Sequence, residues 1–330
     1  MADLLTADIA GAVVALRAGG LVALPTETVY GLAADAENAT AVRRIYSVKG
    51  RPTDHPVIVH LATPAAVEDW AAAVPEWAHA LIAACWPGPL TLVLPRTGRA
   101  SDYVTGGHET VGLRVPAHPM MQQVLAEFGG AVAAPSANRF GRISPTTAAH
   151  VLAELDGVLD PLTDRILDGG QCLVGVESTI VDATGGQPRI LRPGQVTADQ
   201  IEQVTGLRPS TATESLPAPG TLPTHYAPKA AVVLSEAAAA PTTYKQLRDG
   251  HSAPIGVISL KGDEFDGDYT SLSSPTDVAE YAHTLYDALR RADDLRMDIV
   301  LAVLPPEAGM GTAVRDRLKR AAGRGDKAAR

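Results

Sequence analysis

Short apolar runs alternate with amphipathic segments along the first two thirds of the chain. Runs rich in aliphatic and β-branched residues predict strands, and they occupy Leu21–Pro25, Pro56–Leu61, Leu90–Leu94, Val111–Val115, Ala131–Ala134 and Ser178–Val181. Segments with helical periodicity lie between most of them, at Ala7–Ala18, Thr40–Val48, Ala65–Ala73, Glu76–Cys85, Pro119–Phe128 and Thr146–Leu155. This alternation predicts an α/β fold.

Some of the predicted strands follow one another without a helix between them, around residues 90–115 and 178–192. Parallel neighbours need a long crossover connection, whereas antiparallel neighbours need only a short turn. We therefore expect a twisted, mixed, open sheet with helices, and not a fully parallel one.

The composition changes between residues 207 and 229, which are rich in proline, glycine and small polar residues and show no hydrophobic periodicity. Such a stretch is typical of a linker. A second alternation follows, with strands predicted at Ala231–Leu234, Ile255–Leu260 and Ile299–Leu304 and helices at Thr276–Leu295 and Thr312–Ala321. We predict an α/β catalytic domain over residues 1–206, a linker or lid over 207–229, and a small Rossmann-like α/β domain over 230–330.

Composition excludes several classes of protein. The chain has 330 residues, 46% of them hydrophobic and 20% charged, and no apolar run reaches the roughly 18 residues of a membrane span. The first residues lack the basic segment and apolar run of a secretory signal. We therefore expect a cytoplasmic protein that is not bound to a membrane. Cys85 and Cys172 are too few for a disulfide framework and lack metal-ligand spacing. We expect buried thiols and no metal ligands.

The net charge of -9 argues against a protein that coats nucleic acid through its overall field. One short segment is nevertheless basic, with Arg43, Arg44, Lys49 and Arg51 and no acid among residues 41–51. Arginine makes forked contacts to phosphate oxygens and lysine supplies a mobile point charge, so Lys49 and Arg51 together suit a triphosphate. A solvated surface turn is the alternative.

Polar side chains also stand at the ends of predicted strands. Thr26-Glu27-Thr28 directly follows a strand, a position that suits a ligand crevice or a helix cap. His60 ends another apolar strand, where it is either a core histidine or a ligand contact. Arg114 interrupts an apolar strand. Because a buried guanidinium without an anion is costly, Arg114 should meet an internal carboxylate or a substrate carboxylate.

Hydroxyl and amide side chains precede one predicted helix, where they would bind an anion or cap the helix. They are Ser136, Asn138, Ser144 and Thr146. The chain has no G-x-x-x-x-G-K-[ST] loop, no G-x-G-x-x-G fingerprint and no H-E-x-x-H motif. A Walker-type ATPase, an ordinary dehydrogenase and a zinc hydrolase are therefore disfavoured.

Together and in this order, the segments resemble the YrdC-type threonylcarbamoyl-AMP synthases. The resemblance is carried by Pro25-Thr26-Glu27-Thr28-Val29-Tyr30-Gly31, Lys49-Gly50-Arg51-Pro52, Val59-His60, Trp86-Pro87-Gly88-Pro89-Leu90-Thr91, Gly112-Leu113-Arg114-Val115-Pro116, Pro135-Ser136-Ala137-Asn138, Glu177-Ser178-Thr179 and Arg192-Pro193-Gly194. Pro219-Gly220, His225-Tyr226-Ala227-Pro228 and the small C-terminal domain resemble the longer, two-domain branch. The resemblance implies a YrdC-like sheet followed by a linker and a Rossmann-like domain.

That family condenses L-threonine, bicarbonate or CO2, and ATP into threonylcarbamoyl-AMP, with release of pyrophosphate, for N6-threonylcarbamoyladenosine formation in tRNA. The resemblance assigns threonine binding to Thr28, His60, Arg114, Ser136 and Ser178. It assigns ATP binding to Lys49, Arg51, His55, Thr110, Asn138, Thr146, Arg192 and Tyr226, with His55 where the family often has asparagine. Lys49, Arg51 and Arg192 would stabilise the reacting phosphates, with Mg²⁺ held mainly by ATP.

Two other functions remain open from the sequence. A nucleotide- or RNA-binding module without chemistry would use Lys49, Arg51 and the basic tail over residues 315–330, and would bind RNA in a salt-dependent way. An acyl- or carbamoyl-transfer enzyme would apply the same adenylate chemistry to another amino acid or to carbamoyl phosphate. For the synthase, the partner would be a tRNA threonylcarbamoyl transferase that receives the product.

Overall fold

The computed structural model describes residues 4–211, 226–251 and 253–323. The chain divides into two compact units. The first contains Met1–Phe140, Ser144–Leu173 and Glu177–Thr221. The second contains Leu222–Arg330 together with two short segments, Gly141–Ile143 and Val174–Val176.

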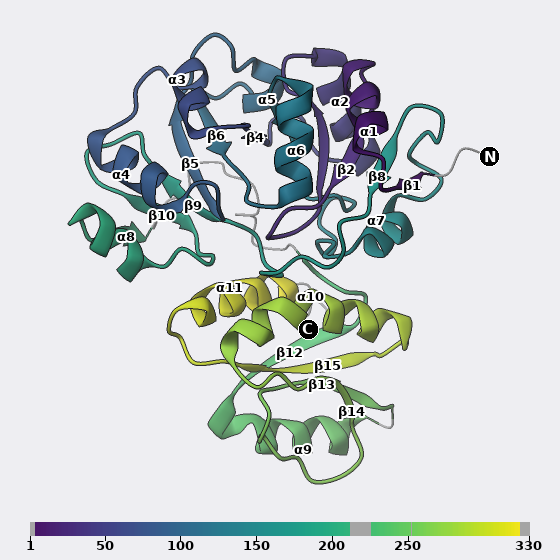
Figure 1. Ribbon diagram of the computed structural model, residues 1–330. Helices are drawn as coiled ribbons and strands as arrows, with labels where there is room; N and C mark the ends of the chain where they lie inside the picture. The colour runs from purple at the N-terminus through teal and green to yellow at the C-terminus, as the bar shows by residue number, and fades with distance from the viewer. Residues whose placement is uncertain (1–3, 212–225, 252, 324–330) are drawn as a thin grey trace. The chain divides into compact units, whose positions relative to one another are not determined.

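In the described part of the first unit, eleven strands form one sheet, in the order β1-β8-β2-β3-β7-β4-β6-β5-β9-β10-β11 (Figure 1). The strands are β1 (Leu5–Thr6), β2 (Val22–Leu24), β3 (Gly31–Asp35), β4 (Ile58–His60), β5 (Leu90–Pro95), β6 (Thr110–Arg114), β7 (Val132–Ala133), β8 (Arg165–Leu167), β9 (Thr179–Asp182), β10 (Arg189–Arg192) and β11 (Ser210–Thr211). Pairs such as β4–β6 and β5–β9 are parallel, whereas β2–β3 and β5–β6 are antiparallel. The predicted mixed sheet is confirmed.

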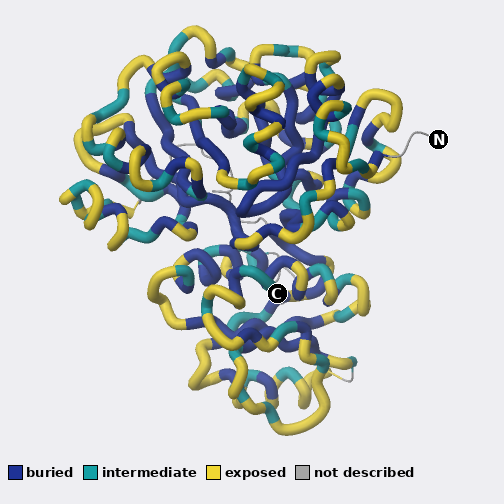
Figure 2. The backbone as a smooth tube through the Cα atoms, in the orientation of Figure 1, coloured by how far each residue is buried: buried dark blue, intermediate teal, exposed yellow. Residues whose placement is uncertain are grey.

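Helices pack on both faces of this sheet. Successive strand residues point to opposite faces, and the apolar side chains on each face pack against helices. Leu21 and Ala23 join a large core with most helices, whereas Val22 and Leu24 join a second core with α1 and α6. The helices are α1 (Ile9–Arg17), α2 (Ala39–Lys49), α3 (Val67–Trp70), α4 (Glu76–Cys85), α5 (Asp102–Thr105), α6 (Pro119–Phe128), α7 (Ala148–Leu155) and α8 (Ala198–Thr205), with a 3-10 turn η1 at Pro64–Ala66. The strands are accordingly buried along most of their length (Figure 2).

The sheet face that α1 and α6 cover near β2 carries other residues where it reaches β4, β5, β9 and β10. On β4, β5, β9 and β10 it carries a small apolar cluster made of strand residues alone, namely Ile58, Val93, Ile180 and Leu191. His60 lies two residues beyond Ile58 and so shares this face. His60 therefore lies beside this cluster of strand residues, on the face that α1 and α6 cover nearer to β2.

The second unit is built on four strands, all parallel in the described residues, in the order β12-β15-β13-β14. They are β12 (Ala231–Glu236), β13 (Ile255–Ile258), β14 (Thr270–Ser273) and β15 (Ile299–Leu304). Helices α10 (Val278–Asp294) and α11 (Met310–Ala322) lie on one face, and α9 (Ala240–Gly250), preceded by a 3-10 turn η2 (Ala237–Ala239), lies on the other (Figure 1). A parallel sheet between helices confirms the predicted Rossmann-like fold.

The predicted linker is described only at its two ends. Ser210–Thr211 pairs in parallel with β10. Residues 212–225, including Pro219-Gly220 and His225, lie outside the described residues. Tyr226 then begins the next stretch with a φ of 63°, an uncommon value for a residue other than glycine.

Two further expectations from the sequence concern single features. Cys172 is buried as predicted, whereas Cys85 is only partly buried, and both are free thiols. Cys85 is the last residue of α4, which explains its partial exposure. No described helix is both long and apolar enough to cross a membrane.

Asp164 holds three segments of the first unit together from a fully buried position. Its carboxylate accepts hydrogen bonds from the backbone N–H of Leu21 at 2.8 Å and of Asp160 at 2.9 Å. Arg44 donates to both carboxylate oxygens, at 3.0 and 2.9 Å. One carboxylate thereby joins the start of β2, the loop before β8, and α2.

Replacing this carboxylate tests its contribution to stability. Asp164→Ala leaves the buried N–H of Leu21 without its acceptor, at about 1–3 kcal/mol, and also removes the acceptor of the less buried Arg44 and Asp160 groups, so we expect the free energy of unfolding to fall by about 3 kcal/mol in urea denaturation. The exposed Asp156 provides a matched control, because Asp156→Ala should change that free energy by less than about 0.5 kcal/mol. Equal effects of the two substitutions would contradict the assignment.

Candidate functional site

Three of the residues predicted to bind threonine meet at one end of the β4–β6 pair. His60 and Arg114 end their strands and are direct neighbours in the parallel register. Thr28, from the turn between β2 and β3, accepts a hydrogen bond at its Oγ1 from Arg114 Nη1 at 3.0 Å. All three side chains are buried. The structure thus brings together residues that lie far apart in the sequence.

Arg114 meets an internal carboxylate, one of the two outcomes predicted for it. Its Nη2 donates to Glu27 Oε1 at 2.6 Å, and its Nε donates to the Gly88 carbonyl at 3.2 Å. The other Glu27 oxygen accepts from the backbone N–H of Ala117 at 3.0 Å. Each guanidinium nitrogen therefore has a partner, and the group is fixed in orientation. Glu27 was absent from the predicted site residues, although the Thr26-Glu27-Thr28 segment had marked its position.

His60 is held as a neutral imidazole. Burial, followed by the nearby Arg114 charge, lowers the pKa of His60 to about 3. Its Nδ1 is buried and has no hydrogen-bond partner among the described residues. A buried polar atom without a partner is unusual, and in this position it favours the ligand contact over the core histidine.

Ser178 and Arg192 form one hydrogen-bonded group. Arg192, the last residue of β10, donates from Nη2 to Ser178 Oγ at 3.0 Å and from Nε to the Ser178 carbonyl at 3.0 Å. Ser178 Oγ also lies 2.8 Å from Thr91 Oγ1 on β5. The resemblance had assigned Ser178 to threonine and Arg192 to ATP. Their direct contact marks where the two sets of residues meet.

Lys49 joins the end of α2 to the turn after β7. Its Nζ donates to the carbonyl oxygens of Ser136 and Asn138. The Lys49 side chain is buried, and this burial, followed by the charge of Arg51, lowers the pKa of the ammonium well below its usual value. An anionic ligand would restore the charged form. Lys49 thus lies where a bound phosphate would stabilise its charged form.

Arg51 shapes the loop that leads into β4. It donates from Nε to the His55 carbonyl at 3.3 Å and from Nη2 to the Pro56 carbonyl at 2.8 Å. The His55 ring lies edge-on to Phe140, with ring centroids 5.4 Å apart. Burial and the Arg51 charge lower the pKa of His55. Thr110 begins β6 at the same end of the strand pair.

Four of these features mark the two ends of the β4–β6 pair. His60 and Arg114 lie at the carboxyl ends, whereas Thr110 and the loop held by Arg51 lie at the amino ends. A strand rises about 3.3 Å per residue, so Thr110 and Arg114 are about 13 Å apart along β6. This spacing suits a ligand, or a pair of ligands, with two chemically different parts.

The loops beside the site contribute a further buried pair. Ser144 Oγ donates to Glu177 Oε1 at 2.6 Å, and both residues are buried. Thr146, predicted to bind ATP, is fully buried, and its Oγ1 lies 3.3 Å from His150 Nδ1. Glu177 was quoted as part of a motif but given no role. Its acceptance of the Ser144 hydroxyl joins the two loops that precede Thr146 and Ser178.

Two predictions on single residues need separate comment. The basic segment is divided, because Arg44 pairs with Asp164 and the Arg43 guanidinium lies 4.0 Å from the centre of the Tyr103 ring. Of the four cations in this segment, Lys49 and Arg51 were the two predicted to bind a triphosphate, and that binding stays a prediction. Tyr226 belongs to the second unit, where its ring stacks on Tyr286 with centroids 5.5 Å apart. Its contact with ATP stays a prediction.

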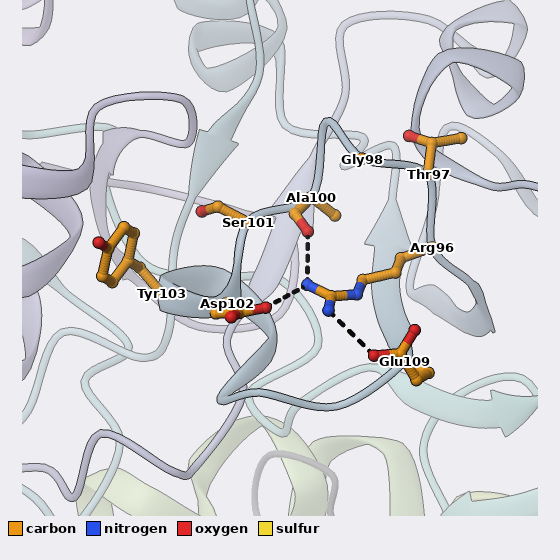
Figure 3. Close-up of a pocket in the computed structure, with 8 residues that line it drawn as sticks. All are labelled: Arg96, Thr97, Gly98, Ala100, Ser101, Asp102, Tyr103 and Glu109. Carbon is orange, nitrogen blue, oxygen red and sulfur yellow. Dashed lines mark hydrogen bonds and ion pairs between the residues drawn. The ribbon is translucent and has the colours of Figure 1, made fainter.

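A separate cavity of about 560 Å³ lies elsewhere in the first unit (Figure 3). Arg96 crosses it and donates to the Ala100 carbonyl at 3.0 Å, to Asp102 at 2.7 Å and to Glu109 at 3.1 Å. None of the predicted site residues lines this cavity. Because Arg96 is engaged by these partners, the cavity has no cation directed at a ligand.

The neutrality of His60 is directly measurable. In a folded protein labelled with ¹³C and ¹⁵N, the His60 ring signals, identified by their loss in His60→Gln, should not titrate between about pH 8 and pH 5. In concentrated urea the same ring should titrate near its ordinary pKa of about 6.5. Because only the unfolded chain takes up this proton between about pH 6.5 and pH 3, His60 makes stability fall as pH decreases through that window. Folded-state titration near pH 6.5 would refute the assignment.

Comparison with known proteins places this geometry in a family. The family model described as "Telomere recombination" matches residues 14–194, and the one described as "Threonylcarbamoyl-AMP synthase, C-terminal domain" matches residues 196–323. The threonylcarbamoyl-AMP synthase of Bacillus subtilis is 40% identical over 328 residues, which cover 96% of this chain and 93% of the relative. The corresponding protein of Pyrococcus abyssi is 39% identical over 320 residues, which cover 93% and 92%.

A solved structure agrees with these matches. The crystal structure of P. abyssi Sua5 complexed with L-threonine has a TM-score of 0.87 and 38% sequence identity, and the match covers 96% of this chain and 94% of that chain. The similarity therefore extends over both units of the chain. The protein belongs to the threonylcarbamoyl-AMP synthase family, as its motifs predicted.

Proposed function

We propose that the protein is an L-threonylcarbamoyladenylate synthase. It would convert L-threonine, bicarbonate or CO2, and ATP into threonylcarbamoyl-AMP and pyrophosphate, for N6-threonylcarbamoyladenosine formation in tRNA. The observation that carries the proposal is the buried Arg114, whose guanidinium is oriented by Glu27 and Thr28 next to His60, whose Nδ1 has no hydrogen-bond partner in the described part of the chain. This arrangement suits the carboxylate and polar groups of a small amino acid.

In this proposal the carboxyl ends of β4 and β6 bind threonine. Arg114 binds the carboxylate, while neutral His60 offers a hydrogen bond without adding a second positive charge. Thr28, Ser136 and Ser178 supply the remaining polar contacts. Since Glu27 already balances Arg114, a zwitterionic amino acid would enter without a change in net charge.

The proposed chemistry needs no protein nucleophile. The threonine ammonium first loses a proton to solvent; the free amine then attacks CO2 and loses a second proton to solvent, which gives the carbamate. A carbamate oxygen then attacks the α-phosphorus of ATP. The bond from that phosphorus to the bridging oxygen breaks, and pyrophosphate leaves with its electron pair. Lys49, Arg51 and Arg192 stabilise the charge on the phosphates by fixed position. His55, Thr110, Asn138 and Thr146 would complete the ATP contacts.

Two features of this proposal concern ions and partners. The described residues bring together no group of three His, Cys, Asp or Glu side chains for a metal. Mg²⁺ prefers oxygen ligands and retains water, so we propose that it enters as the ATP complex, held mainly by phosphates. A tRNA threonylcarbamoyl transferase would consume the adenylate. Because that enzyme acts on tRNA, we propose that the protein works in the cytoplasm.

We also propose a role for each part of the chain. Residues 1–206 would bind the substrates, the linker over residues 207–229 would close over the nucleotide with Tyr226, and residues 230–330 would form the C-terminal domain. Such a lid would exclude water from a hydrolysable adenylate.

The deciding experiment measures pyrophosphate release by the purified chain with Mg²⁺, ATP, bicarbonate and L-threonine, each omitted in turn. We expect release to require both threonine and bicarbonate, and the mass of threonylcarbamoyl-AMP to be found in the quenched mixture. Release without threonine would indicate another acceptor. No release, together with salt-dependent RNA binding, would favour the binding module.

Arg114→Ala should separate the two substrates. Loss of a charged hydrogen-bond donor weakens binding by about tenfold to a hundredfold, so we expect the KM for threonine to rise by that factor and the KM for ATP by less than about twofold. The control is Arg99→Ala, because Arg99 is partly exposed and pairs with Glu37 and Asp69 outside the site. Steady-state kinetics with each substrate varied in turn provides the measurement. An equal rise in both constants would exclude the proposed role.

A further inference from the structure

One side of α10 contacts several segments of the second unit that are distant in sequence. His283, Tyr286, Arg290 and Asp293 follow one another at spacings of three, four and three residues, and so lie along one side of the helix. We call these four residues the α10 stripe. None of them was predicted to have a function.

The first contact of the α10 stripe is with the segment Val174–Val176. Gly175 has a φ of 83°, which strongly favours glycine. A Cβ at Gly175 would lie 2.5 Å from the His283 Cα and 2.4 Å from the Ala282 carbonyl oxygen. Only glycine therefore allows this segment to approach α10 so closely.

The second contact is with the segment Gly141–Ile143. Arg290 donates from Nη2 to the Ile143 carbonyl. Arg142 donates from Nη2 to Asp293 Oδ2 at 3.3 Å, and the Asp293 side chain is only 13% exposed. This segment is thus held by a carboxylate and a guanidinium that lie one turn apart on α10.

The third contact is with the end of the linker and with Ala230, which follows it. Asp293 Oδ1 accepts hydrogen bonds from the backbone N–H of Lys229 at 2.6 Å and of Ala230 at 3.4 Å. Tyr226 stacks on Tyr286, and the Arg317 guanidinium lies 5.5 Å from the centre of the Tyr226 ring. Asp293 therefore binds the end of the linker with one oxygen and Arg142 with the other.

The two segments that contact α10 lead directly into two loops of the candidate site. Ile143 is followed directly by Ser144 and Val176 by Glu177, the two residues joined by the 2.6 Å hydrogen bond. Thr146 and Ser178 come next on the same two loops. The segments that α10 holds therefore set the starting points of both loops.

We propose that the α10 stripe positions residues for the reaction, with Asp293 as its central positioning residue. This inference rests on the proposed function and deepens it. The Asp293–Arg142 pair fixes the segment between Asn138 and Thr146, and the Asp293 bonds to Lys229 and Ala230 fix the chain three residues beyond Tyr226. Because these neighbours belong to the ATP set, Asp293 supports binding of ATP more than binding of threonine.

The test compares Asp293→Asn with Arg142→Gln and with the double variant. Asn retains an oxygen that can accept from the backbone N–H groups, but its amide cannot accept from Arg142 at the other position. We expect each single variant to raise the KM for ATP about fivefold, the effect of one partly buried hydrogen bond, and to change the KM for threonine by less than twofold. The double variant should be no worse than either single one.

The control is Asp294→Asn, which makes the same charge change one residue along, at an exposed position. It should leave both constants unchanged. Arg142→Lys should restore part of the ATP affinity, since it keeps a cation opposite Asp293. Additive effects in the double variant, or equal rises in both KM values, would indicate a general loss of structure and overturn the proposal.

Hydrogen exchange of the free protein tests the same contacts without catalysis. In Asp293→Asn the backbone amides of residues 143–149 should exchange faster than in the parent protein, because the contact with Arg142 is lost, whereas those of Lys229 and Ala230 keep their acceptor and should change little; Asp294→Asn should not differ from the parent at either place. Equal exchange in the two variants would overturn the positioning role. If the parent protein releases no pyrophosphate but the exchange difference is present, the proposed function fails and the positioning role stands.

Discussion

The buried Arg114–Glu27 pair is the constraint on which the arrangement of the site depends. Removing both charges from water is costly, and a buried pair adds little to stability when compared with apolar residues of similar size. The pair nevertheless joins the end of β6 to the turn after β2, and Glu27 also binds the N–H of Ala117. Its benefit therefore lies in orientation. It holds a guanidinium at the carboxyl end of β6, next to a histidine that burial keeps neutral.

Much of the fold follows from local patterns in the sequence. The helices Glu76–Cys85 and Pro119–Phe128 and the strand Ile299–Leu304 have the predicted bounds, because their apolar periods are uninterrupted. The strand Gly31–Asp35 was missed because its alanines and glycine have low strand propensity. Its place between β2 and β7 comes from pairing with neighbours, which a local pattern does not contain.

The site shows the same division between local and distant information. Arg114 and His60 could be found because a charged or titratable residue in an apolar strand is conspicuous. Glu27 could not be assigned as the partner of Arg114, since 87 residues separate them. The same limit applies to Arg44 in the basic segment, because its partner Asp164 lies 120 residues away in the sequence. Sequence therefore indicates which residues need partners, whereas the sheet determines which partners they receive.

Because the net charge of the protein is -9, buried cations near the site matter more for the binding of an anion than the overall field does. An acidic protein does not attract a triphosphate through its overall field, and salt screens exposed charges beyond about 10 Å. Attraction must then come from a few cations at short range. Lys49 and Arg51 lie in such positions, and burial together with the nearby Arg51 lowers the pKa of Lys49. In the proposed function, a bound phosphate would stabilise the charged form of Lys49 and so offset the cost of burying it.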